Sequence, residues 1–247
     1  MGQSSPASHL MTAGPHAVEG QKTLKPVAAK GNPGYVRASR LERRELMKLL
    51  VAGLAFTLTM APSARAEELS KADREKAIKY METTKQAVID ATKPLTKAQW
   101  TFKEADDRWS VADVVEHLAA SEDKFLAVVS EKVMKAPPRP AGDDVKALDE
   151  AIVAKVPDRT KKVQAPEDVR PTNRYGSPEA ALKHFVESRG KTIAFLRKTD
   201  GLRDHAIDGP FGKKLDAYQW LLFCAAHSER HTKQINEVKA SAKFPSA

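Results

Sequence analysis

The chain has 247 residues, with 41 Lys or Arg against 32 Asp or Glu and a formal net charge of +9. Residues 1–66 hold nine basic and three acidic residues, so they carry +6 of this charge, and the rest of the chain carries only +3. A surface this evenly charged gives no reason to expect nucleic acid as a partner.

The first 66 residues have the layout of a leader rather than of a folded domain. The paired arginines Arg43 and Arg44 precede an apolar run from Leu49 to Met60, and the small residues Ala64 and Ala66 occupy the two positions before the cleavage site that a signal peptidase inspects. This order is typical of a cleavable export signal, and the arginine pair resembles the twin-arginine type, which exports folded proteins. We therefore expect a periplasmic or secreted protein.

Two alternatives concern the same segment. Met47 is a second candidate for the start of translation, in which case residues 1–46, which are rich in Gly, Pro, Ser and Lys, are never made. The apolar run could also be a membrane anchor, but the uncharged stretch between Lys48 and Arg65 is shorter than the roughly 20 residues that a spanning helix needs. We expect no stable membrane span in the mature protein.

Residues 67–247 are long enough for one domain with its own core. No segment shows sustained alternation of apolar and polar residues, so we expect an all-α fold without strands. Apolar positions recur with helical spacing in four long segments, each with a recognisable start. The predicted helices cover residues 71–92, 111–135, 177–199 and 216–240.

The second and third predicted helices are separated by residues 136–176, which hold most of the prolines of the mature chain. One short helix, near residues 145–154, is plausible inside this stretch. A connection this long needs a purpose, and a parallel pair of helices supplies one, because the chain must return along the whole bundle before the next helix begins. The sequence predicts a four-helix bundle with one long Pro-rich crossover.

The last predicted helix carries His227 and His231, four residues apart and therefore on one face. A third histidine, His117, shares the inward stripe of the second predicted helix with Val114 and Leu118. Three neutral imidazoles leave at least one position open on a divalent ion, as in reactive metal sites. The alternative is that these histidines are hydrogen-bonded in the core or solvated.

Other polar residues near these positions have two interpretations each. Gln234, one turn after His231, could support a ligand or make an interhelical contact. Arg189 could clamp an anionic substrate or be a paired structural arginine. Cys224 could be a fourth ligand, although a thiol in an apolar run usually packs in the core. No general acid or base stands out, because Glu229 points away from His227 on the helix.

Two segments carry a resemblance to a known family. The segment Trp109-Ser110-x-x-x-Val114-Val115-Glu116-His117-Leu118 and the segment from His227 to Ile235 resemble the signatures of the DinB-like superfamily. The resemblance covers nearly all of residues 70–240. It implies a four-helix bundle in which His117, His227 and His231 bind a divalent metal ion, commonly zinc or nickel, with iron or manganese also admitted.

The resemblance implies a metal-dependent hydrolase or a thiol transferase. A bound divalent ion lowers the pKa of water or of a thiol and so generates a nucleophile at neutral pH. Export separates the protein from cytosolic thiols, which favours water. We therefore expect an exported metal-dependent enzyme that acts on an unidentified small molecule, with a non-catalytic metal-binding or interaction module as the alternative. A homodimer is compatible with the sequence.

Overall fold

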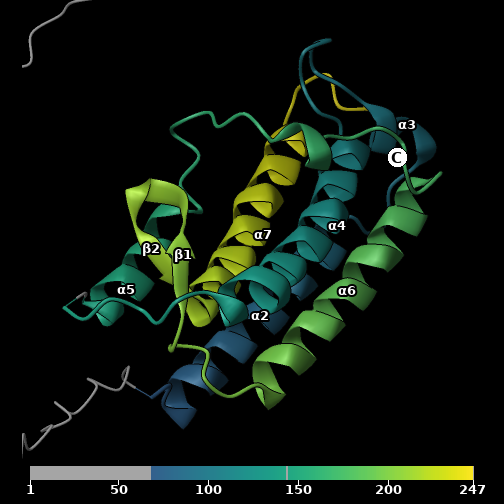
Figure 1. Ribbon diagram of the computed structural model, residues 1–247. Coiled ribbons are helices and arrows are strands. Elements are labelled where there is room, and N and C mark those ends of the chain that lie inside the picture. The colour runs from purple at the N-terminus through teal and green to yellow at the C-terminus, as the bar shows by residue number, and fades with distance from the viewer. Residues whose placement is uncertain (1–67, 143, 247) are drawn as a thin grey trace, which may run out of the picture. The chain divides into compact units, whose positions relative to one another are not determined.

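The computed structural model describes residues 68–142 and 144–246 (Figure 1). The predicted leader, its signal sequence and the cleavage position after Ala66 lie outside the described residues. Within the described part of the chain, no helix is both long enough and apolar enough to cross a membrane.

Four long helices form the bundle: α2 (Lys71–Ala91), α4 (Val111–Ala127), α6 (Pro178–Lys198) and α7 (Ala217–Lys239). Each begins where the sequence predicts, because a polar side chain at the N-cap accepts a hydrogen bond from a backbone N–H of the first turn. The four N-cap residues are Ser70, Ser110, Ser177 and Asp216.

The helices pack as two parallel pairs, α2 with α7 and α4 with α6 (Figure 1). Near the start of both helices the Tyr218 hydroxyl bonds to the carbonyl of Asp73, and near their ends Lys239 bonds to the carbonyl of Ala91, so α2 and α7 run parallel. Each pair lies antiparallel to the other, with α4 against α7 and α2 against α6. The prediction of a parallel pair joined by a long crossover is therefore confirmed for α4 and α6.

The crossover is built from short pieces. It contains α5 (Val145–Lys155), which packs on α7, and the 3₁₀ turn η3 (Glu167–Val169), which packs on α4. A further short helix, α3 (Lys97–Thr101), lies between α2 and α4 and begins with a capping box formed by Thr96 and Gln99. This helix was not among those predicted from the sequence.

The end of α4 differs from the uninterrupted helix predicted to residue 135. After Ala127 the chain continues as a π-helical turn, η1 (Val128–Lys132), and then as a 3₁₀ turn, η2 (Val133–Lys135). The N–H of Val133 reaches back to the carbonyl of Val128, five residues earlier. The prolines at 137 and 138 then prevent any further helix.

The expectation of no strands was wrong in one place. Between α6 and α7 the strands β1 (Ala206–Asp208) and β2 (Lys214–Asp216) pair antiparallel, with Ile207 opposite Leu215. The 3₁₀ turn η4 (Pro210–Gly212) joins them, and Gly212 has the positive φ of 65° that such a turn requires. Three residues are too few for a periodic pattern to be visible in the sequence.

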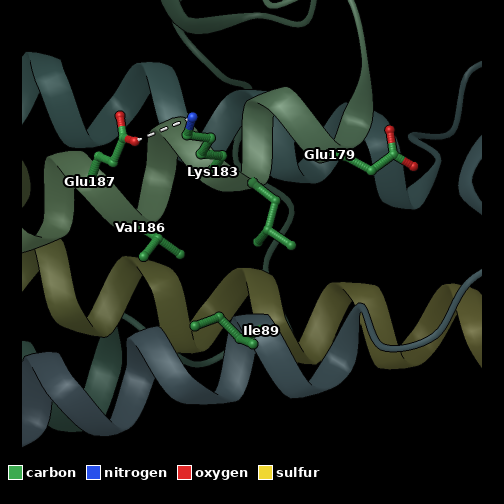
Figure 2. A pocket seen from close by; sticks show the side chains of 6 residues that line it. Ile89, Glu179, Lys183, Val186 and Glu187 are labelled. Carbon is green, nitrogen blue, oxygen red and sulfur yellow. Dashed lines mark ion pairs between the residues drawn. The ribbon is translucent and has the colours of Figure 1, made fainter.

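The apolar core consists of two clusters, one at each end of the bundle. Outside this core, an apolar groove of about 370 Å³ lies on the outer side of α2 and α6. Figure 2 shows Ile89 of α2 facing Val186 of α6 across this groove, with the ion pair between Lys183 and Glu187 at its edge. None of the three predicted metal ligands lines it, because they project from α4 and α7.

Candidate metal centre

The three histidines predicted as ligands lie together between α4 and α7. The Nε2 atom of His227 is 3.2 Å from Nε2 of His117 and 3.1 Å from Nε2 of His231. One nitrogen from each ring can be chosen so that all three lie within 4.8 Å of one another, an arrangement that could hold a metal ion. The antiparallel packing of α4 against α7 brings these distant residues to one point.

Hydrogen bonds on the far side of two rings determine which nitrogen faces this point. Nδ1 of His117 is 2.8 Å from the carbonyl oxygen of Val169, which can only accept, so this Nδ1 carries the proton. Nδ1 of His231 is 2.8 Å from Oε1 of Gln234. Arg159, which can only donate, bonds to the same atom, so this atom is an acceptor and Nδ1 of His231 also carries its proton. Both histidines therefore direct a bare Nε2 lone pair toward His227.

This arrangement leaves lone pairs facing one another. His227 has at most one proton on Nε2, so it can satisfy only one of the two neighbouring nitrogens. The Ser121 hydroxyl lies 3.5 Å from Nε2 of His117, at the long limit of a hydrogen bond. A cation among the three rings would satisfy all of them. The two distances to His227 fit as well, because nitrogens at 2.0–2.1 Å from a tetrahedral zinc ion lie about 3.3 Å apart.

The surroundings keep the three rings neutral, which is the form that binds a metal ion. Burial lowers the pKa of His117, and it holds the pKa values of His227 and His231 well below the usual range for histidine. The neighbouring imidazoles add to this effect for His227 and His231. No proton therefore competes with a cation for these nitrogens near neutral pH.

The crossover is fastened beside His117 by its neighbour Glu116. The Glu116 carboxylate accepts hydrogen bonds from the backbone N–H groups of Thr172, Asn173 and Arg174. Burial opposes ionisation of this carboxyl, but these bonds outweigh it and lower the pKa of Glu116. The anchor holds the chain that carries the Val169 carbonyl, and no local sequence pattern indicates this contact.

Two roles were predicted for Gln234, support of a ligand or an interhelical contact, and the structure favours the first. Its side chain accepts the bond from His231, while Arg159 of the crossover donates to the same Oε1 at 3.3 Å and forms a two-pronged ion pair with Glu237. Arg159 thereby orients the amide that orients the His231 ring.

Arg189 is a paired structural arginine and does not face a substrate. Its side chain is fully buried, and both prongs of the guanidinium bond to Glu122 at 2.8 Å. The remaining N–H groups bond to Met81, Thr84 and Ser228. Cys224 belongs to this same buried cluster, with Sγ 3.1 Å from Glu122, and is absent from the group that could hold a metal.

The other two described histidines lie away from this centre. His184 bonds to Asp123 at 2.6 Å and packs against Tyr175. His205 precedes β1 and forms an isolated bridge with Pro138. Its Nδ1 is buried without a hydrogen-bond partner among the described residues.

Comparison with known proteins finds two similar proteins. An uncharacterised protein of Bacillus subtilis, YuaE, is 25% identical over 150 residues, which is 60% of this chain and 87% of YuaE. The solved structure of YfiT, also from B. subtilis and described as a probable metal-dependent hydrolase with an unusual four-helix bundle topology, aligns with 23% identity and a TM-score of 0.45. That alignment covers 70% of this chain and 89% of YfiT.

The model of the DinB superfamily matches residues 80–235, which is more than half of the chain. The matched range begins in α2 and ends in α7, so it contains all four bundle helices in part or in full. It also contains His117, His227 and His231. The chain belongs to the DinB superfamily.

Proposed function

We propose that this protein is a metal-dependent enzyme, a hydrolase or a transferase, in which the Nε2 atoms of His117, His227 and His231 hold one divalent ion. The observation that carries the proposal is the convergence of three neutral imidazoles whose nitrogens lie 3.1–3.2 Å apart around His227. Two of these rings have their protons committed elsewhere, to Val169 and Gln234. Such a donor set suits a divalent ion, with zinc and nickel first, and iron and manganese also admitted.

A divalent ion with three protein ligands lowers the pKa of a water or thiol in its remaining position and supplies a nucleophile at neutral pH. The chain's own contribution is orientation and exclusion of solvent. Val169 and Gln234 keep the rings of His117 and His231 in one tautomer and one direction. Trp109 packs against both rings, with centroids 5.0 Å and 6.4 Å away, and covers that side of the centre.

Metal analysis tests the first part of this proposal. Protein purified without a chelator or a histidine tag is expected to contain about one divalent ion per chain. His117→Ala and His231→Ala should each lose it. His184→Ala is the matched control, because His184 is a partly exposed histidine bonded to Asp123 and far from the triad in sequence and contacts. Equal metal content in all four proteins would refute the assignment of the ligands.

A second candidate role follows from the position of the triad. The ligands come from two helices, so a bound ion would join α4 to α7 and brace the bundle without any catalysis. Metal removal distinguishes the two roles. If the metal-free protein stays folded but loses activity toward ester, amide or thiol probes, the ion is catalytic. If it unfolds and the metal-loaded protein turns over none of these probes, the bracing role is correct.

The leader supports a further part of the proposal, that the enzyme works after export on a small molecule outside the cytosol. The support is the sequence of residues 1–66 alone, with its arginine pair and apolar run. N-terminal sequencing of protein recovered from the periplasm or the medium should give Glu67 as the first residue. Recovery of uncleaved protein in the cytosol would contradict export and would bring a thiol back as an equally favoured nucleophile.

A further inference from the structure

The three rings of the metal centre differ in how far solvent reaches them. His117 is 3% exposed and His231 is 8% exposed, whereas His227 is half-buried. Trp109 packs on the two buried rings. His227 is thus the least buried of the three, and a molecule that approaches the centre along its side meets the residues on that side first.

Three half-buried aromatic side chains surround His227 on this side, and we call them the aromatic wall: Phe125 of α4 with Trp220 and Phe223 of α7. Phe125 lies edge-to-face against the imidazole at a centroid distance of 5.4 Å, and Phe223 stacks on it at 6.3 Å. The three aromatic rings also contact one another, at centroid distances of 5.5–6.2 Å. The wall is thus continuous with the least buried of the three histidines.

The wall contains one polar atom whose hydrogen bond is missing. Nε1 of Trp220 is buried and has no hydrogen-bond partner among the described residues. A buried donor without an acceptor destabilises the folded protein, so such groups are rare unless a ligand or a water completes them. The aliphatic residues of the adjoining core have no such unmet requirement.

The position of the wall follows from the helical repeat of α7. Trp220, Phe223 and His227 are separated by three and four residues, so they lie along one face of the helix. Phe125 lies eight residues after His117 on α4, which is about two turns along the same face. Because α4 and α7 are antiparallel, Phe125 and Phe223 lie in the same direction along the bundle from the histidines of their own helices, and both contact His227.

We propose that the aromatic wall is a substrate subsite, which binds an aromatic or bulky apolar group attached to the reacting function and offers the Trp220 N–H to an acceptor oxygen on that group. The inference rests on the proposed metal centre and names the substrate class for it: aryl or bulky acyl compounds. Planar rings gain from edge-to-face and stacked contacts with the wall beyond the apolar area that they bury.

Binding of two hydroxamic acids to the zinc-loaded full-length mature protein, measured by calorimetry, tests this assignment. Both compounds carry the same metal-chelating head, but acetohydroxamic acid bears a methyl group where benzohydroxamic acid bears a phenyl ring. We expect the phenyl compound to bind on the order of tenfold more tightly, a difference of about 1.4 kcal/mol. Equal affinities would overturn the subsite. Failure of the protein to bind zinc would instead refute the metal centre itself.

Substitutions in the wall locate the preference. Phe125→Leu and Phe223→Leu should each reduce the ratio of the two affinities, phenyl over methyl, to about twofold or less. Phe195→Leu is the matched control, since Phe195 of α6 is also a half-buried phenylalanine packed on the core, and it should retain the full preference. A preference that survives both wall variants would show that the ring binds elsewhere and would overturn the proposal.

The role of the Trp220 N–H has its own test. Of the two benzohydroxamic acids with an acetyl group at the 3- or 4-position, at least one should bind several-fold more tightly than the unsubstituted compound. Trp220→Phe keeps an aromatic ring and removes the donor, so it should abolish this gain while the preference for phenyl over methyl remains. If neither acetyl compound gains affinity, or if the gain survives in Trp220→Phe, the proposed hydrogen bond does not exist.

Discussion

Two polar clusters lie next to each other inside the bundle, and they differ in whether the protein satisfies them. In the cluster around Arg189, each N–H of the guanidinium has an acceptor, and Glu122 supplies two of them. In the cluster around His227, three imidazole nitrogens face one another, and the donors near them are one proton on Nε2 of His227 and the Ser121 hydroxyl, which lies a long 3.5 Å from Nε2 of His117. The two clusters meet on α7, where Ser228 of the first directly follows His227 of the second.

The comparison separates a structural role from a functional one by hydrogen-bond accounting. A buried group whose donors and acceptors are all matched needs nothing from outside, so it serves the fold. A buried group with a standing deficit must obtain a partner from solution or destabilise the protein. Charge alone would have suggested the opposite assignment, with Arg189 and Glu122 in the functional role, because these two residues are charged and the histidines are neutral.

Breaking the satisfied cluster should have the largest effect on stability. Arg189→Met leaves the Glu122 carboxylate buried without its partner, and we expect the free energy of unfolding to fall by about 3–5 kcal/mol. Urea denaturation of the metal-free protein measures this loss. The double variant with Glu122→Leu should recover most of the stability, because an apolar pair of similar size needs no desolvation of charge. If the double variant is as unstable as the single one, the ion pair is not the cause.

Filling the unsatisfied cluster should have the next largest effect. Zinc at about 100 times its dissociation constant is expected to raise the free energy of unfolding by about 2.7 kcal/mol, because only the folded chain brings the three rings together. Thermal unfolding with and without zinc provides the measurement. His227→Ala should abolish the gain, whereas His184→Ala should keep it. A gain of the same size in His227→Ala would place the zinc at another site.

A smaller effect, on metal affinity, is expected at Gln234, which bonds to His231 but is not one of the three proposed ligands. Gln234→Leu removes the acceptor that orients His231, and loss of such a partner typically weakens metal binding by about 10–100-fold. Gln234→Glu keeps an acceptor at the same place and serves as the control, with affinity at or above that of the parent. Competition with a zinc-sensitive dye gives both constants. Equal weakening in the two variants would mean that Gln234 acts through packing rather than through its oxygen.

The sequence predicted those features that are written in local patterns. The N-caps Ser110, Ser177 and Asp216 determined where three bundle helices begin, and the length of the crossover predicted the parallel pair. The four-residue spacing of His227 and His231 predicted their common face. That His117 would join them required the antiparallel contact between α4 and α7, for which the family resemblance was the stronger argument.

Features that depend on contacts between distant segments were not predicted. The Val169 carbonyl that bonds to His117 comes from a turn 52 residues later, and no residue type marks a backbone carbonyl. The anchoring of the crossover by Glu116 is equally non-local. The aromatic wall combines Phe125 with two residues of α7, and each of the three looks like an ordinary core residue in its own helix. Only packing in three dimensions shows that they adjoin the least buried histidine.

The smallest effect at neutral pH, and the one most specific to the unsatisfied cluster, concerns acid. Burial lowers the pKa values of His117, His227 and His231 in the folded chain, while in the unfolded chain they titrate near the usual value of about 6.5. Below that pH the unfolded chain binds more protons, so the metal-free protein should lose stability as the pH falls from about 6.5, and it should gain nothing above that pH. The lowered pKa values of Glu116 and Glu229 act in the same direction but in a more acidic range, below the ordinary titration of glutamate near 4.5.

Urea denaturation at pH 7, 6 and 5 measures how steeply the free energy of unfolding falls with pH, and the double variant His117→Leu with His231→Leu should flatten this slope. An unchanged slope in that variant would mean that His117 and His231 bind as many protons in the folded chain as in the unfolded chain, and it would contradict the lowered pKa values.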